Sequence, residues 1–305
     1  MTDSRAKSKF LSVLGILAAG VLTLSMSACA GSSDPADGGD ADTSTIVIGA
    51  DDGTEAHWTI HKDKLADEGI TLEVRTINDG VQLNQGVQDG ELDVNLFQHL
   101  IFLSEFNVKN DGTLVPVGAT ALYPLALYSE EYSSIEDLPD GAKVAVPNNP
   151  TNLARALLNL QKAGLLELKD GGNSLSGPDD IVSGTVEVLP VDTNQTVAAL
   201  KDGSAQAAVV NNTQAQKGGL GDDLIIFKED LDDPELAPYI NAFFVREDQA
   251  DDPRWAKLVE AYHSPEVEEA VTELNQGNLQ FKGDWTAEDL QAELTDLEDQ
   301  LRASK

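Results

Sequence analysis

The sequence predicts an α/β protein whose body forms two lobes with a ligand cleft between them. Short apolar or alternating runs, typical of strands, take turns along the chain with amphipathic runs, typical of helices. This alternation occurs in two successive blocks, and extended segments near 118–128 and 238–245 can pass between them. Alternating strands and helices favour mainly parallel sheets. Small ligands often bind between two such lobes.

Composition restricts the class of protein. The 305 residues carry 53 acidic against 20 basic side chains, a net charge of −33, which opposes nucleic-acid binding because phosphate backbones need clustered Lys and Arg. One cysteine allows neither an internal disulfide nor a cysteine-based zinc cage. A mean hydropathy of −0.22 opposes a multi-span membrane protein.

The N-terminus predicts export. Arg5, Lys7 and Lys9 precede an apolar run over 10–24, and small residues follow it. A basic start, an apolar core and a small-residue cleavage region are typical of a secretory signal peptide, here residues 1–28. The apolar run is shorter than the roughly 20 residues that a membrane-spanning helix needs.

The single cysteine, Cys29, follows this segment directly. Residues 24–29 resemble the cleavage site of bacterial lipoproteins, in which the first mature residue is a lipidated cysteine. A stray cysteine after an ordinary cleavage site is the alternative. Lipidation of Cys29 would tether the protein to the outer face of a membrane. Residues 29–44 would then form a lipidated, flexible tether, because they are small and polar and lack apolar periodicity.

The first block opens with an apolar strand, and the turn-forming run 51–54 leads from it into a helix. The next strand alternates in polarity, Gly90 separates the second helix from a short strand, and Pro124 keeps the long apolar run 115–128 extended. The expected strands are 46–50, 70–77 and 92–95, and the expected helices are 55–68, 81–88 and 98–106.

The second block contains the clearest helix signal. A strand over 143–146 runs into Pro147-Asn148-Asn149-Pro150-Thr151, a helix start, and an amphipathic helix over 152–163 ends at Gly164. Further strands are expected at 186–189, 207–210, 224–227 and 240–245, and further helices at 194–201, 253–263, 265–275 and 287–303. The predicted first lobe comprises 45–121 and 243–305, and the predicted second lobe comprises 122–242.

No enzyme signature is present in the sequence. It contains no Gly-x-Ser-x-Gly elbow, phosphate-binding loop or dinucleotide fingerprint, so neither catalysis nor a cofactor is predicted. His57 and His61, four residues apart on a helix, could share a metal, but no further His or Cys completes a ligand set. We therefore expect them on a solvated or cleft-edge face, with no metal site. Acidic pairs such as Asp51-Asp52 are expected at the surface.

The stretch 146–155 predicts a site for an anion. It joins a strand end, a tight turn and a helix N-terminus, where free backbone N–H groups and the helix dipole favour negative charge. Asn152 and Arg155 lie three residues apart and share one face of that helix. Arg155 could hold a carboxylate bidentately while Asn152 adds a hydrogen bond. In the alternative interpretation, Arg155 only solvates the helix surface.

Several motifs together resemble the methionine-binding lipoproteins of the NlpA/MetQ type. These are Phe97-Gln98-His99 after an Asp-x-Asn strand, Tyr123-Pro124, the long motif VPNNPTNLARALLNLQKAGL and Tyr239-Ile240-Asn241. The resemblance covers the chain from residue 45 and the lipoprotein start. It implies a two-lobed type II periplasmic-binding-protein fold that delivers methionine to a membrane permease powered by an ATPase.

The resemblance also implies roles for matching residues. Arg155, with Asn152 nearby, would hold the ligand carboxylate, and Asn211 and Asn241 would bind its ammonium or carboxylate. Phe97, His99 and Tyr123 would line the pocket around the thioether, because sulfur packs well against aromatic rings. Ordinary core packing is the alternative for each of these three rings.

Two departures from the family pattern affect the predicted specificity. Gly80 stands where family members often have an aromatic residue, and Leu100-Ile101-Phe102 replace the usual polar, Pro and Tyr positions after His99. Trp58 or His57 could fill the space at Gly80, or the pocket could take another apolar amino acid or a methionine-containing dipeptide. A receptor for another small anion or a metal, and a surface interaction lipoprotein that has lost transport, remain alternatives.

Overall fold

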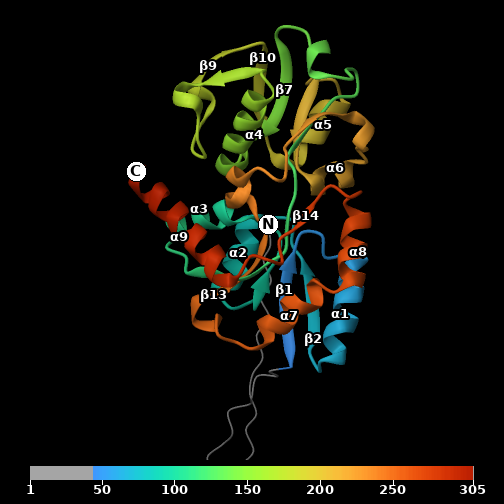
Figure 1. Cartoon of the computed structure of the whole chain (residues 1–305), viewed down its shortest axis with the longest axis vertical. Coiled ribbons are helices and arrows are strands. Elements are labelled where there is room, and N and C mark those ends of the chain that lie inside the picture. Colours follow the sequence, from blue (N-terminus) through green and yellow to red (C-terminus); the bar gives the residue numbers. More distant parts are fainter. Residues whose placement is uncertain (1–43, 305) are drawn as a thin grey trace, which may run out of the picture. The chain divides into compact units, whose positions relative to one another are not determined.

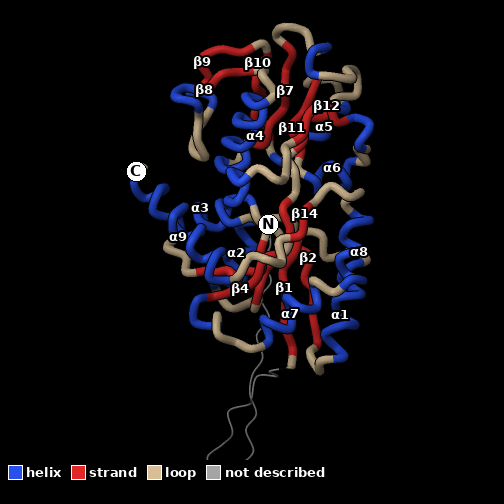
Figure 2. Tube along the Cα trace, viewed as in Figure 1, coloured by secondary structure: helices blue, strands red, loops and turns tan. Residues whose placement is uncertain are grey.

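The computed structural model describes residues 44–304, which belong to one compact unit of the chain. The predicted signal peptide, Cys29 and all of the predicted tether except residue 44 lie outside the described residues. Two five-stranded sheets organise the described part, and Figure 2 shows their strands in red with helices beside them. No helix among residues 44–304 combines the length and apolar character needed to cross a membrane.

The first lobe is built around a sheet with strand order β2-β1-β3-β13-β4. One of its faces packs against α2, α3 and α9, and the other packs against α1, α7 and α8 (Figure 1). Its strands are β1 (Thr45–Ala50), β2 (Thr71–Thr76), β3 (Val94–Asn95), β4 (Leu114–Ala119) and β13 (Ala242–Arg246). Its helices are α1 (His57–Asp67), α2 (Gly80–Gln88), α3 (Leu100–Asn110), α7 (Arg254–Tyr262), α8 (Pro265–Leu274) and α9 (Ala287–Ala303).

The second lobe has a sheet with strand order β10-β7-β11-β6-β12. Apolar side chains of α4 pack against one face of this sheet, and those of α5 and α6 pack against the other. Its strands are β6 (Ala126–Tyr128), β7 (Ala142–Pro147), β10 (Val186–Val191), β11 (Ala207–Val210) and β12 (Ile225–Lys228). Its helices are α4 (Pro150–Lys162), α5 (Thr196–Lys201) and α6 (Asn212–Gly218), and a small hairpin joins β8 (Leu166–Leu168) to β9 (Ile181–Gly184).

Two chain segments cross between the sheets, as the extended runs predict. One connects β4 to β6 and the other connects β12 to β13, and they lie side by side because Thr120 N donates to Asn241 O and Asn241 N donates to Ala121 O. The first segment contains β5 (Ala121–Leu122), which pairs with β14 (Gln280–Phe281). Main-chain hydrogen bonds therefore hold the two crossing segments together where they connect the lobes.

Both sheets are mainly parallel, as predicted, with one reversed strand in each: β13 in the first sheet and β6 in the second. β1 runs parallel to β2 and β3, and β7 runs parallel to β10 and β11, but β13 is antiparallel to β3 and β4, and β6 is antiparallel to β11 and β12. A βαβ crossover returns the chain in the same direction, whereas a strand that enters from the other lobe arrives in the opposite direction. The two crossings therefore make both sheets mixed.

The α4 start agrees with its predicted signal. Asn149 caps the helix by accepting a hydrogen bond from Asn152 N at 3.0 Å, and Pro150 occupies the first turn, where its missing N–H costs nothing. The helix predicted at 98–106 instead begins at Leu100. His99 caps it, since its Nδ1 accepts from Phe102 N at 3.2 Å.

A buried cluster of amide side chains supports the loop that carries Phe97 and His99. Asn84 of α2, Asn95 of β3 and Gln98 are at most 3% exposed. Asn95 Nδ2 donates to Asn84 Oδ1 at 3.0 Å, Asn84 Nδ2 donates to Gln98 Oε1 at 2.9 Å, and Gln98 Nε2 donates to Asn95 Oδ1 at 3.1 Å. Each amide therefore bonds to the other two, and Asn95 Nδ2 also donates to Leu83 O at 3.4 Å.

Replacing Asn84 with Leu should lower the free energy of unfolding by about 3 kcal/mol, because it leaves buried amide groups of Asn95 and Gln98 without partners. Urea unfolding followed by circular dichroism measures this change. Gln85→Leu, on the exposed face of the same helix, is the control and should change stability by less than about 0.5 kcal/mol. Equal effects of the two substitutions would contradict this account of the cluster.

Candidate functional site

A cavity of about 620 Å³ lies between the lobes, lined by residues from both. The first lobe contributes the ends of β1 and β3 and the start of α3, and the second contributes the starts of α4 and α6. All seven residues predicted to bind a ligand line this cavity: Phe97, His99, Tyr123, Asn152, Arg155, Asn211 and Asn241. Residues that are far apart in the sequence thus meet around one cavity.

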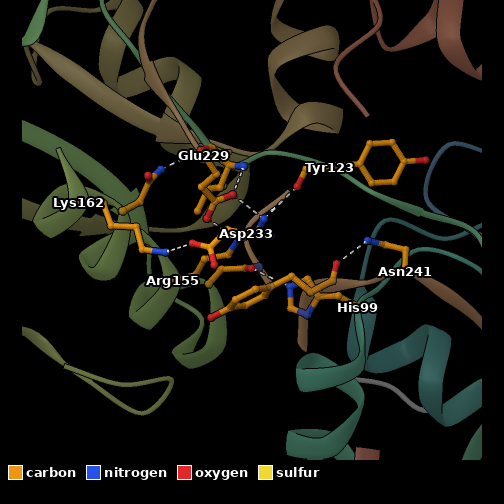
Figure 3. A network of polar contacts seen from close by, with 11 residues as sticks. His99, Tyr123, Arg155, Lys162, Glu229, Asp233 and Asn241 are labelled. Carbon is orange, nitrogen blue, oxygen red and sulfur yellow. Dashed lines mark hydrogen bonds and ion pairs between the residues drawn. The ribbon is translucent and has the colours of Figure 1, made fainter. Parts of the chain in front are cut away.

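Arg155 is buried and held in a fixed orientation. It is 5% exposed, and its Nε and Nη2 donate to Oε1 and Oε2 of Glu229 at 2.9 and 2.6 Å. Nη2 also donates to the main-chain oxygen of Tyr123 at 2.9 Å (Figure 3). The guanidinium carbon lies 4.2 Å from the centre of the Tyr239 ring. Nη1 makes no hydrogen bond with any residue in 44–304. The alternative of an Arg155 that solvates the helix surface is wrong.

The sequence did not predict Glu229 as a site residue, because no sequence signal distinguishes it. It stands directly after β12 in the acidic run Glu229-Asp230, like many acidic residues in this chain. In the fold Glu229 is 8% exposed, and its carboxylate also accepts from Leu125 N at 2.7 Å. Three donors from two chain segments therefore converge on this one side chain.

His99 and Asn152 connect the two lobes across the cavity. His99 Nδ1 accepts from Phe102 N, so the ring proton belongs on Nε2, which donates to Asn152 Oδ1 at 2.9 Å. Burial, and then the charge of Arg155, lowers the pKa of His99 to about 4. His99 is therefore neutral at pH 7. The side-chain nitrogen of Asn152, Nδ2, has no hydrogen-bond partner within residues 44–304.

Asn241 and Asn211 are positioned by local structure. Asn241 Nδ2 donates to Tyr239 O at 3.4 Å in the crossing segment, and its Oδ1 has no hydrogen-bond partner among the described residues. Asn211 caps α6, because its Oδ1 accepts from Gln214 N at 2.8 Å. Its side-chain nitrogen, Nδ2, makes no hydrogen bond within the described part of the chain. One side-chain atom of each residue, Oδ1 of Asn241 and Nδ2 of Asn211, is thus available to a ligand.

Comparison with known proteins identifies the family. The model of the NlpA lipoprotein family matches residues 46–281, more than three quarters of the chain. The chain belongs to the NlpA lipoprotein family. The D-methionine-binding lipoprotein MetQ of Salmonella typhi is 39% identical over 242 residues, which are 77% of this chain and 88% of that protein.

Solved structures of NlpA-type and related binding proteins share the fold. The crystal structure of the methionine-binding protein MetQ has a TM-score of 0.73 and 35% identity, and the match covers 79% of this chain and 99% of that one. A nutrient-binding protein from Burkholderia cenocepacia, bound to methionine, has a TM-score of 0.72 and 33% identity, with 78% and 99% covered. These relatives are binding proteins, and they confirm the two-lobed periplasmic-binding-protein fold.

The two departures from the NlpA pattern meet in the fold. Phe97 and Phe102 pack edge to face with ring centres 5.8 Å apart, and both rings lie against Gly80. A Cβ atom at Gly80 would come within 2.7 Å of Phe97 and 3.1 Å of Phe102. An aromatic residue at position 80 would therefore clash with the present arrangement. Phe102, which the sequence did not nominate, is part of the cavity lining.

The atoms nearest to a Cβ at Gly80 belong to Phe97 and Phe102, and not to Trp58 or His57, the residues suggested for this space. Trp58 is 2% exposed in the core of the first lobe, and its Nε1 donates to Asp52 Oδ1 at 2.9 Å. His57 lines the cavity but is 3% exposed, and His61 is fully buried with its Nε2 bonded to Leu258 O at 3.0 Å. The expected solvated or cleft-edge face therefore holds only for His57, which lies at the cleft, and is wrong for His61, which lies in the core. Residues 44–304 contain no group of three or more His, Cys, Asp or Glu that could hold a metal.

Asp51 and Asp52 line the cavity, so the prediction that they lie at the surface is wrong. Burial, and then the charge of Asp52, raises the pKa of Asp51 to about 6. Burial also raises the pKa of Asp52 above its ordinary value. Lys217 of α6 reaches across the cleft and donates to Asp51 O at 3.1 Å. Two acidic residues after an apolar strand carried no signal that separated them from the many surface acids.

The pH dependence of stability should reflect the buried histidines. Burial lowers the pKa of His57, His61 and His99 to about 4, against about 6.5 in an unfolded chain. Their contribution is complete above pH 6.5 and is lost as the pH falls toward 4, because the unfolded chain then binds more protons. The raised pKa of Asp51 acts in the opposite direction between about pH 6 and 4.

His61→Phe tests this expectation away from the cleft. The free energy of unfolding, measured in urea from pH 7.5 to 4.5, should fall less steeply than in the wild type. The two slopes should differ by the uptake of one proton, which corresponds to at most about 1.4 kcal/mol of unfolding free energy per pH unit. Phe suits the site because His61 already packs among Trp58, Phe243 and Tyr262. Parallel curves for the two proteins would contradict a neutral His61.

Proposed function

We propose that this chain is an extracytoplasmic substrate-binding lipoprotein of an ABC importer and that the amino acid it binds in the interlobe cleft is methionine. Membership of the NlpA family and the relatives named for methionine binding support this assignment. The observation that carries it is a buried, oriented guanidinium facing the same cavity as an aromatic wall. An amino acid with an apolar side chain presents matching groups to both.

The proposed roles follow from the free groups around the cavity. Nη1 of Arg155 and the amide nitrogen of Asn152 would donate to the ligand carboxylate. Asn241, through Oδ1, would accept from the ammonium, and Asn211 would donate to the carboxylate through its amide nitrogen. The rings that line the thioether end would be Phe97, His99, Tyr123 and Phe102. Nothing in this arrangement calls for a cofactor or a covalent step.

The cellular setting is part of the proposal. Cys29 would carry the lipid that tethers the protein to the outer face of the cell membrane, with residues 30–44 as the linker. The two lobes, 45–121 with 243–305 and 122–242, would grip the ligand from both sides and so favour a form that docks on the permease and its ATPase. Methionine would be the transported cargo.

A methionine-containing dipeptide is the second candidate, and the size and polarity of the cavity favour it. About 620 Å³ lies within the range of about 300–1,000 Å³ that takes drug-sized ligands, and methionine is smaller than these. Tyr123 O accepts a hydrogen bond from Arg155. Burial raises the pKa of the Tyr123 hydroxyl, and the nearby charges of Asp52 and Asp51 raise it further. The ammonium and carboxylate of a dipeptide lie about 3.5 Å farther apart than those of an amino acid. A dipeptide could therefore reach both Arg155 and the acidic pair Asp51-Asp52.

Mass spectrometry of small molecules released from the purified, denatured protein distinguishes the candidates. We expect methionine, or a dipeptide that contains it, in near-stoichiometric amount. Calorimetric titration of the stripped protein with the same compound should then show one binding site. A different apolar amino acid would correct the specificity alone. No released compound and no heat with methionine or a dipeptide would overturn the proposed function and favour a surface interaction protein.

Arg155→Ala should weaken methionine binding by about a hundredfold or more, which corresponds to about 3 kcal/mol, because the ligand carboxylate loses its charged partner. Calorimetry measures the affinity. Lys162→Ala is the matched control on the same helix: it removes an exposed ion pair with Asp233 and should change affinity less than threefold.

Arg155→Ala also leaves Glu229 buried without its partner, so thermal unfolding of the ligand-free variant must accompany the titration. Asn152→Ala gives a second test that keeps the Arg155–Glu229 pair, and it should weaken binding by about tenfold, the effect of one charge-assisted hydrogen bond. A folded Arg155→Ala variant with less than a threefold change would contradict the role of the guanidinium.

A further inference from the structure

Glu229 contacts Arg155 from the side that faces away from the cleft. It does not line the 620 Å³ cavity, whereas Arg155 does. Both residues line a second cavity behind the ion pair, and Glu229 receives Nε and Nη2 of Arg155 together with Leu125 N. Figure 3 shows the carboxylate and guanidinium in contact, with the main-chain oxygen of Tyr123 beside them. A ligand in the cleft would therefore meet Arg155 but not Glu229.

The charges around the cleft depend strongly on this pair. Within residues 44–304, the Lys and Arg side chains that line the cavity are Arg155 and Lys217, and five acidic residues line it as well: Asp51, Asp52, Glu55, Asp79 and Asp192. Glu229 cancels the charge of Arg155 at hydrogen-bonding distance, where two opposite charges interact most strongly. The cleft is thus not a positively charged site despite its buried arginine.

We propose that Glu229 is a positioning residue that determines specificity: by orienting and neutralising Arg155, it makes the cleft select zwitterionic ligands over anionic ones. A zwitterion gives its carboxylate to Nη1 of Arg155 and its ammonium to nearby acceptors, and it adds no net charge to the cleft. A ligand with the same carboxylate but no ammonium brings a net negative charge into a site that already contains several acids. Desolvation of that charge is then poorly compensated.

The test uses L-methionine and its 2-hydroxy analogue, which keeps the carboxylate and the thioether but has a hydroxyl in place of the ammonium. It rests on the proposed function, because it assumes an amino-acid site. Calorimetry at pH 7.5 gives the ratio of the two dissociation constants. The wild type should prefer methionine, and Glu229→Gln, which keeps the shape and removes the negative charge, should reduce that preference at least tenfold.

Two further variants keep the test sharp. Asp233→Asn removes a neighbouring acid that pairs with exposed Lys162, and it should leave the preference unchanged. The double variant Arg155→Gln/Glu229→Gln retains the net charge of the pair, so both ligands should bind more weakly while their ratio stays within threefold of the wild type. This second measurement is informative even if Glu229→Gln alone does not fold.

The outcomes separate the inference from the function on which it rests. A folded Glu229→Gln variant whose preference stays within threefold of the wild type overturns the inference and leaves the binding function intact. A double variant whose preference collapses overturns it as well. A wild type that binds neither compound overturns the proposed amino-acid site together with this inference.

Discussion

The buried ion pair between Arg155 and Glu229 is the interaction on which the site depends. It joins the first half of α4 to the segment that leaves β12, and through Tyr123 O it also holds the other crossing segment. Burying two charges is costly, and such pairs often add little net stability. What this pair provides is geometry: with Nε and Nη2 both engaged, the guanidinium has one orientation and one nitrogen left for a ligand.

The remaining polar groups of the cleft are arranged around that fixed point. Tyr239 lies between Arg155 and His99. The guanidinium of Arg155 lies over its ring, and the His99 ring is nearly perpendicular to it, with the two ring centres 5.3 Å apart. Burial, and then the positive charge of Arg155, lowers the pKa of His99 and so keeps the ring neutral. A neutral ring can accept from Phe102 N and donate to Asn152 at once, which a protonated ring could not do. Burial and the charge of Arg155 together therefore set the protonation state of the ring that links the lobes.

Local signals in the sequence were sufficient for the parts of the site that are local in the chain. The cap at Asn149, Pro150 in the first turn and the spacing of Asn152 and Arg155 all act within about six residues, and the α4 start agrees with them. Glu229 lies 74 residues from Arg155, and its role arises only when the crossing segments meet. The acidic pair at the end of β1 likewise became part of the cavity through packing. Neither Glu229 nor the pair Asp51-Asp52 could be predicted as part of the site, because the chain contains many acidic residues and most of them are solvated.

Gly80 and Phe102 show why residues that depart from a family pattern are best interpreted together. Taken alone, the missing aromatic residue at position 80 predicts a vacant space, and the sequence suggested Trp58 or His57 to fill it. In the fold, the rings of Phe97 and Phe102 lie against the Gly80 backbone, so a side chain there would have to displace them. The aromatic wall is thus built from the loop before α3 and the first turn of that helix, above the buried amides of Asn84, Asn95 and Gln98. Since those amides fix the loop, the shape of the apolar end is set by the core of the first lobe, whereas the charged end is set by the second lobe and the crossing segments. A ligand that fits both ends must therefore bring the two lobes into one particular relation.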